Sequence, residues 1–204
     1  MIISNEYKFV YYDIPKTAST SLDYYFRKNY NGIICLPAMS QSYRTIKHNR
    51  TLPDEAKDYI KIASVRNPYH RAVSCFFYLR HLQRIYLKKE QPPALHFDSF
   101  LDHIIKHKHS AINVETMVHS TQTEYLRQSN VTDYIALRIE NIEDELKKLP
   151  FYKSNVKFPV LHYNKTIDEK NQYTPKWFDM YTNERREKII EWANEDFENF
   201  GYEK

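Results

Sequence analysis

Hydrophobic and aromatic residues gather in three short runs along the chain. The runs are Tyr7–Asp13, Tyr59–Val65 and Tyr134–Arg138. The first of them does not alternate strictly between apolar and polar positions, which is typical of a strand buried on both faces of a sheet. We therefore predict three strands of one central sheet.

Segments of helical periodicity follow these runs. After the first run, Ser19 or Thr20 is available as a helix N-cap, and after the second, Pro68 suits the first turn of a helix that runs to about Lys88. Further helices are predicted at 98–108, 141–149 and 182–200, whereas 120–129 is a polar stretch to which no helix or strand is assigned. Strands that alternate with helices predict an α/β fold with a central, mostly parallel sheet flanked by helices. The length of 204 residues suits a single domain, 1–204.

Composition and charge narrow the function classes. A formal charge of +4 suits an anionic ligand but is too low for a nucleic-acid-binding surface unless it is clustered. Cys35 and Cys75 have neither the spacing of a metal site nor that of a disulfide framework, and we expect them to be small core residues. No targeting segment and no run of about 18 apolar residues occurs, so we expect a cytoplasmic protein without stable membrane insertion.

The first loop, PKTASTS at residues 15–21, carries the chemistry of an anion-binding site. In a parallel α/β sheet, ligands bind beyond the carboxyl ends of the strands, where helix N-termini present free backbone N–H groups. Lys16 adds an ammonium, and the loop offers several hydroxyl donors for phosphate or sulfate oxygens. The loop has no glycine and its lysine precedes the hydroxyls, so it is not the GxxxxGK[ST] loop of ATP- and GTP-binding proteins. The hydroxyl residues are Thr17, Ser19, Thr20 and Ser21.

A second candidate anion-binding element follows the second strand. Arg66 leaves that strand at its carboxyl end, and Arg71 and Ser74 follow within RNPYHRAVS. Alone, this segment is more typical of a helix begun by proline with arginines on its surface. Together with the first loop it predicts a ligand with two separated anionic groups.

At these residues the sequence resembles the sulfotransferase family, in particular the branch that contains carbohydrate sulfotransferases. Its members carry PKTxxTS or PKxGTT in the first loop and VRNPxxRxxS in the second, and this chain has IPKTASTSL and SVRNPYHRAVS. The similarity spans nearly the whole chain in family order. Further matching segments are KHNRT, QTEYL, ALRIENIEDELKKL, LHYNKT and DFENFGY.

The resemblance implies a fold like that of P-loop NTPases, no metal, and a donor, 3′-phosphoadenosine-5′-phosphosulfate (PAPS). It implies that Lys16 contacts the bridging oxygen of the leaving group, and that Arg66 and Ser74 bind the 3′-phosphate. Ala18 stands where many members have glycine, which leaves the backbone path of the loop open. The residues implied to hold the 5′-phosphate are Pro15, Lys16, Thr17, Ala18, Ser19, Thr20 and Ser21, and Asn164, Lys165 and Thr166 match the late segment that closes over the donor.

Sulfuryl transfer to a hydroxyl also needs a base, and histidine is the residue that titrates near neutrality. We predict His48 in IKHNRT as the base, because similar carbohydrate sulfotransferases place a histidine ahead of the VRNP strand. His162 is the second candidate for the base. His103, His107 and His109 include an i, i+4 pair, but no HExxH pattern supports a metal site there.

From these features we predict a PAPS-dependent sulfotransferase that acts on a hydroxyl acceptor, with a saccharide favoured. One alternative is a nucleotide-dependent phosphotransferase on a related sheet, which the missing lysine-serine pair of the phosphate loop disfavours. The other is a module that binds a nucleotide or glycan without catalysis. Lys16 and a candidate base favour the enzyme.

Overall fold

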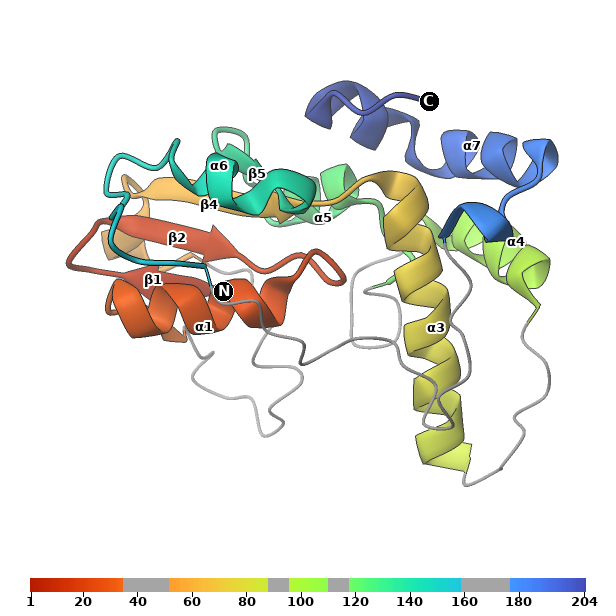
Figure 1. The fold of residues 1–204 in the computed structure, drawn as a ribbon, viewed down its shortest axis with the longest axis horizontal. Coiled ribbons are helices and arrows are strands. Elements are labelled where there is room, and N and C mark those ends of the chain that lie inside the picture. The colour runs from red at the N-terminus through yellow and green to blue at the C-terminus, as the bar shows by residue number, and fades with distance from the viewer. Residues whose placement is uncertain (35–51, 88–95, 110–117, 159–176) are drawn as a thin grey trace.

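The strands form one five-stranded sheet, which lies in the left half of the molecule in Figure 1. The computed structural model describes residues 1–34, 52–87, 96–109, 118–158 and 177–204. The strand order is β3-β1-β2-β4-β5. The strands are β1 (Ile2–Ser4), β2 (Phe9–Tyr12), β3 (Ile33–Ile34), β4 (Ile60–Val65) and β5 (Ile135–Arg138).

The three predicted strands are confirmed as β2, β4 and β5, and they pair in parallel. Tyr12 of β2 lies opposite Ala63 of β4, and Ala63 lies opposite Ala136 of β5. Strands β1 and β3 were not predicted, and they extend the sheet in antiparallel pairing. Because β2 and β4 are parallel neighbours, the loops that leave their carboxyl ends lie at the same edge of the sheet.

The predicted helices are present with small shifts at their ends. Thr182 caps the last helix, where its side chain accepts a hydrogen bond from the backbone N–H of Arg185. No helix was predicted in the polar stretch 120–129, and the structure has one there, α5 (Gln122–Gln128). The helices are α1 (Ser19–Asn29), α3 (Pro68–Leu87), α4 (Phe97–His107), α5 (Gln122–Gln128), α6 (Ile142–Leu146) and α7 (Asn183–Phe200), with 3₁₀ turns at Asp54–Ala56, Ile139–Asn141 and Trp177–Met180.

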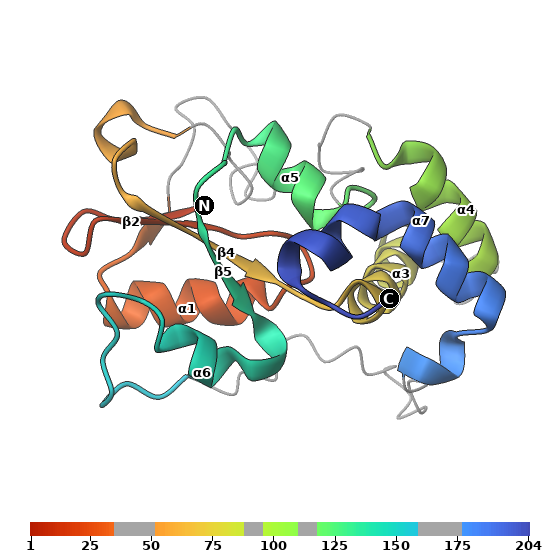
Figure 2. The same cartoon turned by 90° about the horizontal axis from the view of Figure 1, so that it is seen from above.

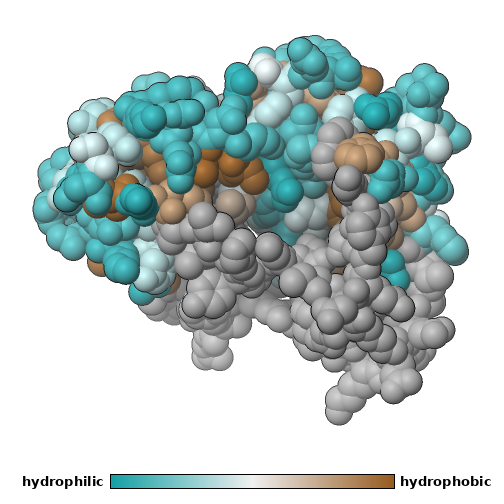
Figure 3. Space-filling model, viewed as in Figure 1, coloured by the Kyte–Doolittle hydropathy of each residue, from teal (hydrophilic) through white to brown (hydrophobic). Residues whose placement is uncertain are grey.

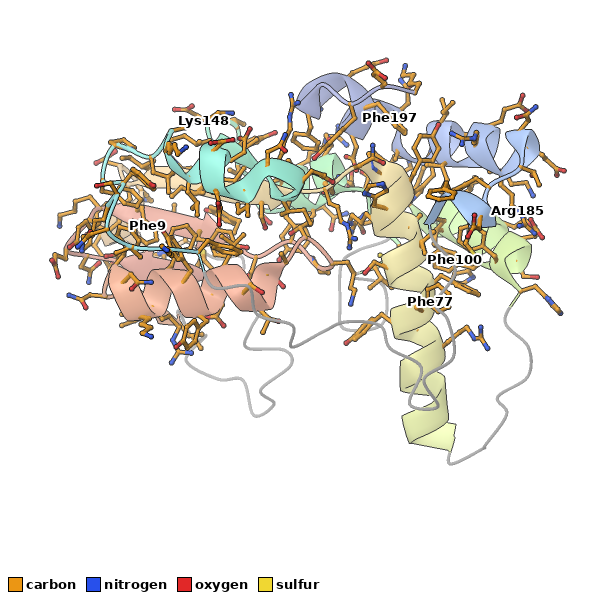
Figure 4. The ribbon with its side chains drawn as sticks, in the orientation of Figure 1. Phe9, Phe77, Phe100, Lys148, Arg185 and Phe197 are labelled. Carbon is orange, nitrogen blue, oxygen red and sulfur yellow. The ribbon has the colours of Figure 1, made fainter. Side chains whose placement is uncertain are left out.

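Helices cover both faces of the sheet (Figure 2). Phe9 and Tyr11 of β2 pack toward α1 and α6, and Phe9 lies in this layer in Figure 4. Val10 and Tyr12 pack on the other face with α5 and the end of α7. The residues of β2 thus alternate between two buried faces, which explains why its sequence is apolar throughout.

A second core region lies among α3, α4 and α7, beyond the end of β4. It is rich in aromatic side chains, including Phe100 of α4 and Phe197 of α7, which Figure 4 labels. Cys75 is buried in this region, as expected for a small core residue, and burial raises the pKa of its thiol. Arg185 of α7 binds the carboxylate of Asp98 of α4 through two hydrogen bonds of 2.6 and 2.7 Å.

Hydrophilic residues cover most of the described surface in Figure 3, and hydrophobic ones show mainly where that surface meets the grey segments. The large hydrophobic side chains that are exposed within the described residues are Tyr24, Ile33 and Phe178. A search of the same described residues finds no helix with the length and apolar character needed to cross a membrane.

Candidate functional site

The loop between β2 and α1 folds into a left-handed path. Lys16 and Ala18 have φ values of 68° and 58°, and Thr17 between them does not have a positive φ. Such alternation turns successive backbone N–H groups toward one point, as in the nests that bind anions. The loop therefore has the backbone geometry of an anion cradle at the start of a helix.

Helix α1 begins without a side-chain cap. The predicted N-caps, Ser19 and Thr20, are wrong, because Ala18 occupies the N-cap position and its side chain makes no capping hydrogen bond. A helix N-terminus carries a partial positive charge and backbone N–H groups that have no partner within the helix. An anion in the loop would complement both, and the side chains of the first turn, Ser19 to Ser21, remain partly exposed.

We expect Ala18→Gly to raise the free energy of unfolding by about 0.5–1 kcal/mol. Relief of about 1–2 kcal/mol of left-handed strain exceeds the extra unfolded-state entropy of glycine, about 0.4–1 kcal/mol. The measurement is the urea unfolding curve. Ala72→Gly in the right-handed helix α3 is the matched control, and it should lose about 1 kcal/mol or more. Equal destabilisation by both changes would contradict the left-handed assignment of Ala18.

Thr17 anchors the loop to the sheet. Its hydroxyl donates to the carbonyl of Ile14 at 2.8 Å and lies 2.7 Å from the hydroxyl of Ser64 in β4. Ser64 continues the chain of hydrogen bonds to the phenol of Tyr11 at 2.7 Å. One of the four predicted hydroxyl donors therefore faces the core, and Thr17 can serve a bound anion only through its backbone N–H.

Arg66 begins the second loop and touches the first. Its guanidinium donates to the carbonyl oxygen of Lys16 at 3.4 Å, so the two predicted anion-binding loops lie side by side. Burial lowers the pKa of Arg66, and the carboxylate of Glu140 opposes that shift. Glu140 also accepts a hydrogen bond of 2.7 Å from the backbone N–H of Asn67, which holds the turn that follows Arg66.

Arg71 lies beneath both loops and is fully buried. Its guanidinium donates to the carbonyl of Pro15 at 3.1 Å and to the carbonyl of Ser120 at 2.9 Å. Within the described residues, neither Arg66 nor Arg71 forms an ion pair with a carboxylate. Arg71 is therefore a buried positive charge with no carboxylate at ion-pair distance among the described residues, which favours an anionic ligand at this edge of the sheet.

One face of α3 is turned toward the first loop. Arg71 contacts Pro15, and the ring of Tyr78 lies 4.4 Å from the ammonium of Lys16. Ser74 is three residues after Arg71 and four before Tyr78, so it lies on the same face of the helix between them. The structure thus brings Lys16, Arg66 and Ser74 to one edge of the sheet.

This pair of loops, with its lysine and arginine, spans only part of the chain, but the similarity to one known family extends over nearly all of it. The profile of the sulfotransferase family matches residues 1–203. The chain belongs to the sulfotransferase family. Comparisons with curated proteins and with solved structures found no match.

Several predicted residues of this sulfotransferase lie outside the described part of the chain. They are the candidate bases His48 and His162 and the late segment Asn164, Lys165 and Thr166. Their predicted roles stay predictions. Sequence reasoning did not anticipate Tyr78, although its position on the face of Ser74 could have indicated it.

Three histidines of the sulfotransferase gather between α4 and the start of α5. The ring of His103 lies 4.5 Å from that of His107 and 4.6 Å from that of His119, measured between centroids. Burial, together with the charges of His103 and His107, lowers the pKa of His119 to about 4, so the cluster includes a neutral, buried imidazole at neutral pH. Within the described segments, no group of three histidine, cysteine or acidic residues is arranged to hold a metal ion.

Proposed function

We propose that this protein transfers a sulfuryl group from PAPS to a hydroxyl acceptor, and that the acceptor is a carbohydrate. Membership of the sulfotransferase family supports sulfuryl transfer in general. The observation that carries the choice of donor is the contact between the loop of Lys16 and the loop of Arg66. Two adjacent cationic loops suit a ligand with phosphate groups at two positions, as PAPS has.

In this proposal the first loop holds the 5′-phosphosulfate. The backbone N–H groups of residues 16–18 and the start of α1 complement its negative charge, and the hydroxyls of Ser19, Thr20 and Ser21 add donors. Pro15 fixes the entry to the loop through its carbonyl contact with Arg71. The second loop holds the 3′-phosphate through Arg66 and Ser74, and residues 164–166 close over the donor.

The reaction itself requires one bond to form and one to break. The acceptor oxygen forms a bond to sulfur, and the bond between sulfur and the bridging oxygen of the 5′-phosphate breaks. Lys16 contacts that bridging oxygen and stabilises the charge that develops on the leaving 3′-phosphoadenosine-5′-phosphate (PAP). His48 takes the proton of the acceptor hydroxyl as the general base, an effect worth about 10²- to 10⁴-fold in rate.

The choice of a carbohydrate acceptor is supported by the resemblance of the two loops to the carbohydrate branch of the family. The family membership itself is compatible with other hydroxyl acceptors. A panel of saccharides incubated with PAPS that carries a labelled sulfuryl group tests this choice, and we expect label on at least one saccharide. Transfer to phenols or steroids but to no saccharide would contradict the carbohydrate assignment.

Thermal stability in the presence of nucleotides tests the donor. We expect PAP at about 100 times its dissociation constant to stabilise the protein by about 2.7 kcal/mol, which raises the melting temperature by about 5–10 °C. The shift should not require Mg²⁺ and should exceed that of AMP or ADP. A shift that needs ADP and Mg²⁺ together would favour a phosphotransferase, and PAP binding without transfer to any acceptor would favour a non-catalytic module.

A further inference from the structure

The segment that leads into α5 is polar and yet buried. Ser120 and Gln122 have no exposed surface, and Thr121, Thr123 and Glu124 are exposed by less than a tenth. Buried polar groups are normally held by hydrogen bonds, because their burial is otherwise unfavourable. The partners of this segment connect it to the candidate donor site.

The side chain of Gln122 pairs with the backbone of Arg66 in both directions. Its Oε1 accepts from the N–H of Arg66 at 2.8 Å, and its Nε2 donates to the carbonyl oxygen of Arg66 at 2.9 Å. The amide of Gln122 thus satisfies both polar backbone groups of the residue at which β4 ends. This double contact fixes the peptide from which the Arg66 side chain projects.

Asp196 of α7 holds Gln122 in that orientation. One carboxylate oxygen, Oδ2, accepts from the backbone N–H of Gln122 at 2.9 Å and from its Nε2 at 3.0 Å. The other oxygen, Oδ1, accepts from the N–H of Thr123 at 2.8 Å. Asp196 is fully buried, and these three donors at the start of α5 compensate its charge. Figure 2 shows α5 and α7 next to each other at this end of the sheet.

The same segment also supports the first loop. The carbonyl of Ser120 accepts from Arg71, and Arg71 also donates to the carbonyl of Pro15. Ser120 and Gln122, two residues apart, are thereby linked to both candidate phosphate loops.

We propose that Gln122, oriented by Asp196, is a positioning residue that sets Arg66 for the 3′-phosphate of the donor. Neither residue touches the nucleotide, and both act through the backbone of Arg66. The pair therefore determines how strongly the enzyme prefers a nucleotide with a 3′-phosphate over one without it. This proposal rests on the proposed function.

Gln122→Met tests the proposal, because methionine keeps an unbranched side chain of similar length and removes all three side-chain hydrogen bonds. Thr121→Ala is the matched control. Thr121 is the N-cap of α5, and its hydroxyl oxygen accepts from the N–H of Glu124 at 3.1 Å, so its loss weakens the same helix but leaves the pair of Gln122 and Arg66 intact. Asp196→Asn is the second variant, which keeps the shape of the side chain and replaces one acceptor oxygen by a donor.

The measured quantity is the dissociation constant of AMP divided by that of PAP, from isothermal titration calorimetry. We expect this ratio to fall about tenfold in Gln122→Met and in Asp196→Asn, and to stay at the wild-type value in Thr121→Ala. The ratio reports on the 3′-phosphate, so a uniform loss of stability does not change it.

An unchanged ratio in a folded Gln122→Met or Asp196→Asn protein would overturn the proposal. An equal fall in Thr121→Ala would overturn it as well, because the effect would then come from loosening of α5 as a whole. Equal affinity of the wild-type protein for AMP and for PAP would instead contradict the proposed function. The failure of the positioning role is therefore distinguishable from the failure of the donor assignment.

Discussion

Replacement of Lys16 by alanine should lower kcat about 10³-fold and change the dissociation constant of PAP by less than about tenfold. The ammonium is proposed to act on charge that develops at the bridging oxygen as the S–O bond breaks, and loss of one such contact typically lowers the rate by about 10²- to 10³-fold. The backbone N–H groups of the loop and the start of α1 are unaffected, so the ground-state phosphate keeps most of its donors. Transfer of labelled sulfuryl groups to a saccharide mixture gives kcat, and calorimetry gives the affinity.

Lys28→Ala is the matched control for this change. Lys28→Ala also removes one lysine charge, but Lys28 lies in the last turn of α1, far from the loop of Lys16, and its ammonium is 5.3 Å from the centroid of the Tyr24 ring. Its variant should retain wild-type turnover. A Lys16→Ala enzyme with kcat within tenfold of the wild type would show that Lys16 does not stabilise the leaving group.

His48→Ala tests the proposed base separately from the contact of Lys16 with the leaving group. It should lower kcat by about 10²- to 10⁴-fold and leave the affinity for PAP nearly unchanged. Full activity in His48→Ala would remove this residue as the base and direct attention to His162.

Replacement of Arg66 by alanine should weaken PAP binding by about 10- to 100-fold and leave AMP binding within about threefold of the wild type. A hydrogen bond between charged groups contributes about 1.5–3 kcal/mol, and Arg66 is proposed to make one to the 3′-phosphate, which AMP lacks. Calorimetric titration with both nucleotides measures the difference.

Arg27→Ala serves as the control for Arg66→Ala. Arg27 is exposed on α1, where its guanidinium lies 3.8 Å from Asp23, and its loss should change neither affinity. If Arg66→Ala weakened PAP and AMP equally, Arg66 would not be a ligand of the 3′-phosphate.

The parallel strands and the position of the two loops could be predicted from the sequence. The apolar run of β2 gives way to the polar loop that begins at Pro15, and the apolar run of β4 gives way to the loop that begins at Arg66. Parallel pairing of adjacent strands then places both loops at one edge, which the contact between Arg66 and Lys16 confirms. In contrast, β1 and β3 have three and two residues, which is too short for a pattern of residues to indicate a strand.

The details of the loops depend on tertiary contacts that no local pattern carries. Thr17 looks like Ser19 in the sequence, but its hydroxyl is hydrogen-bonded to that of Ser64, which is 47 residues away along the chain. Helix α5 looks like a polar loop because several of its buried side chains are polar, and that of Gln122 is satisfied by the distant Arg66 and Asp196. Hydrophobic periodicity reports burial of apolar residues only, so a helix buried through polar contacts escapes it.

The carboxylate that orients Gln122 lies 74 residues further along the chain, in the last helix. Synthesis proceeds from the N-terminus, so the strands and both loops leave the ribosome before Asp196 does. A nascent chain of this protein can form its sheet early, but its affinity for a nucleotide should mature only when α7 docks onto α5. Donor binding would thus report the docking of α7, rather than formation of the sheet.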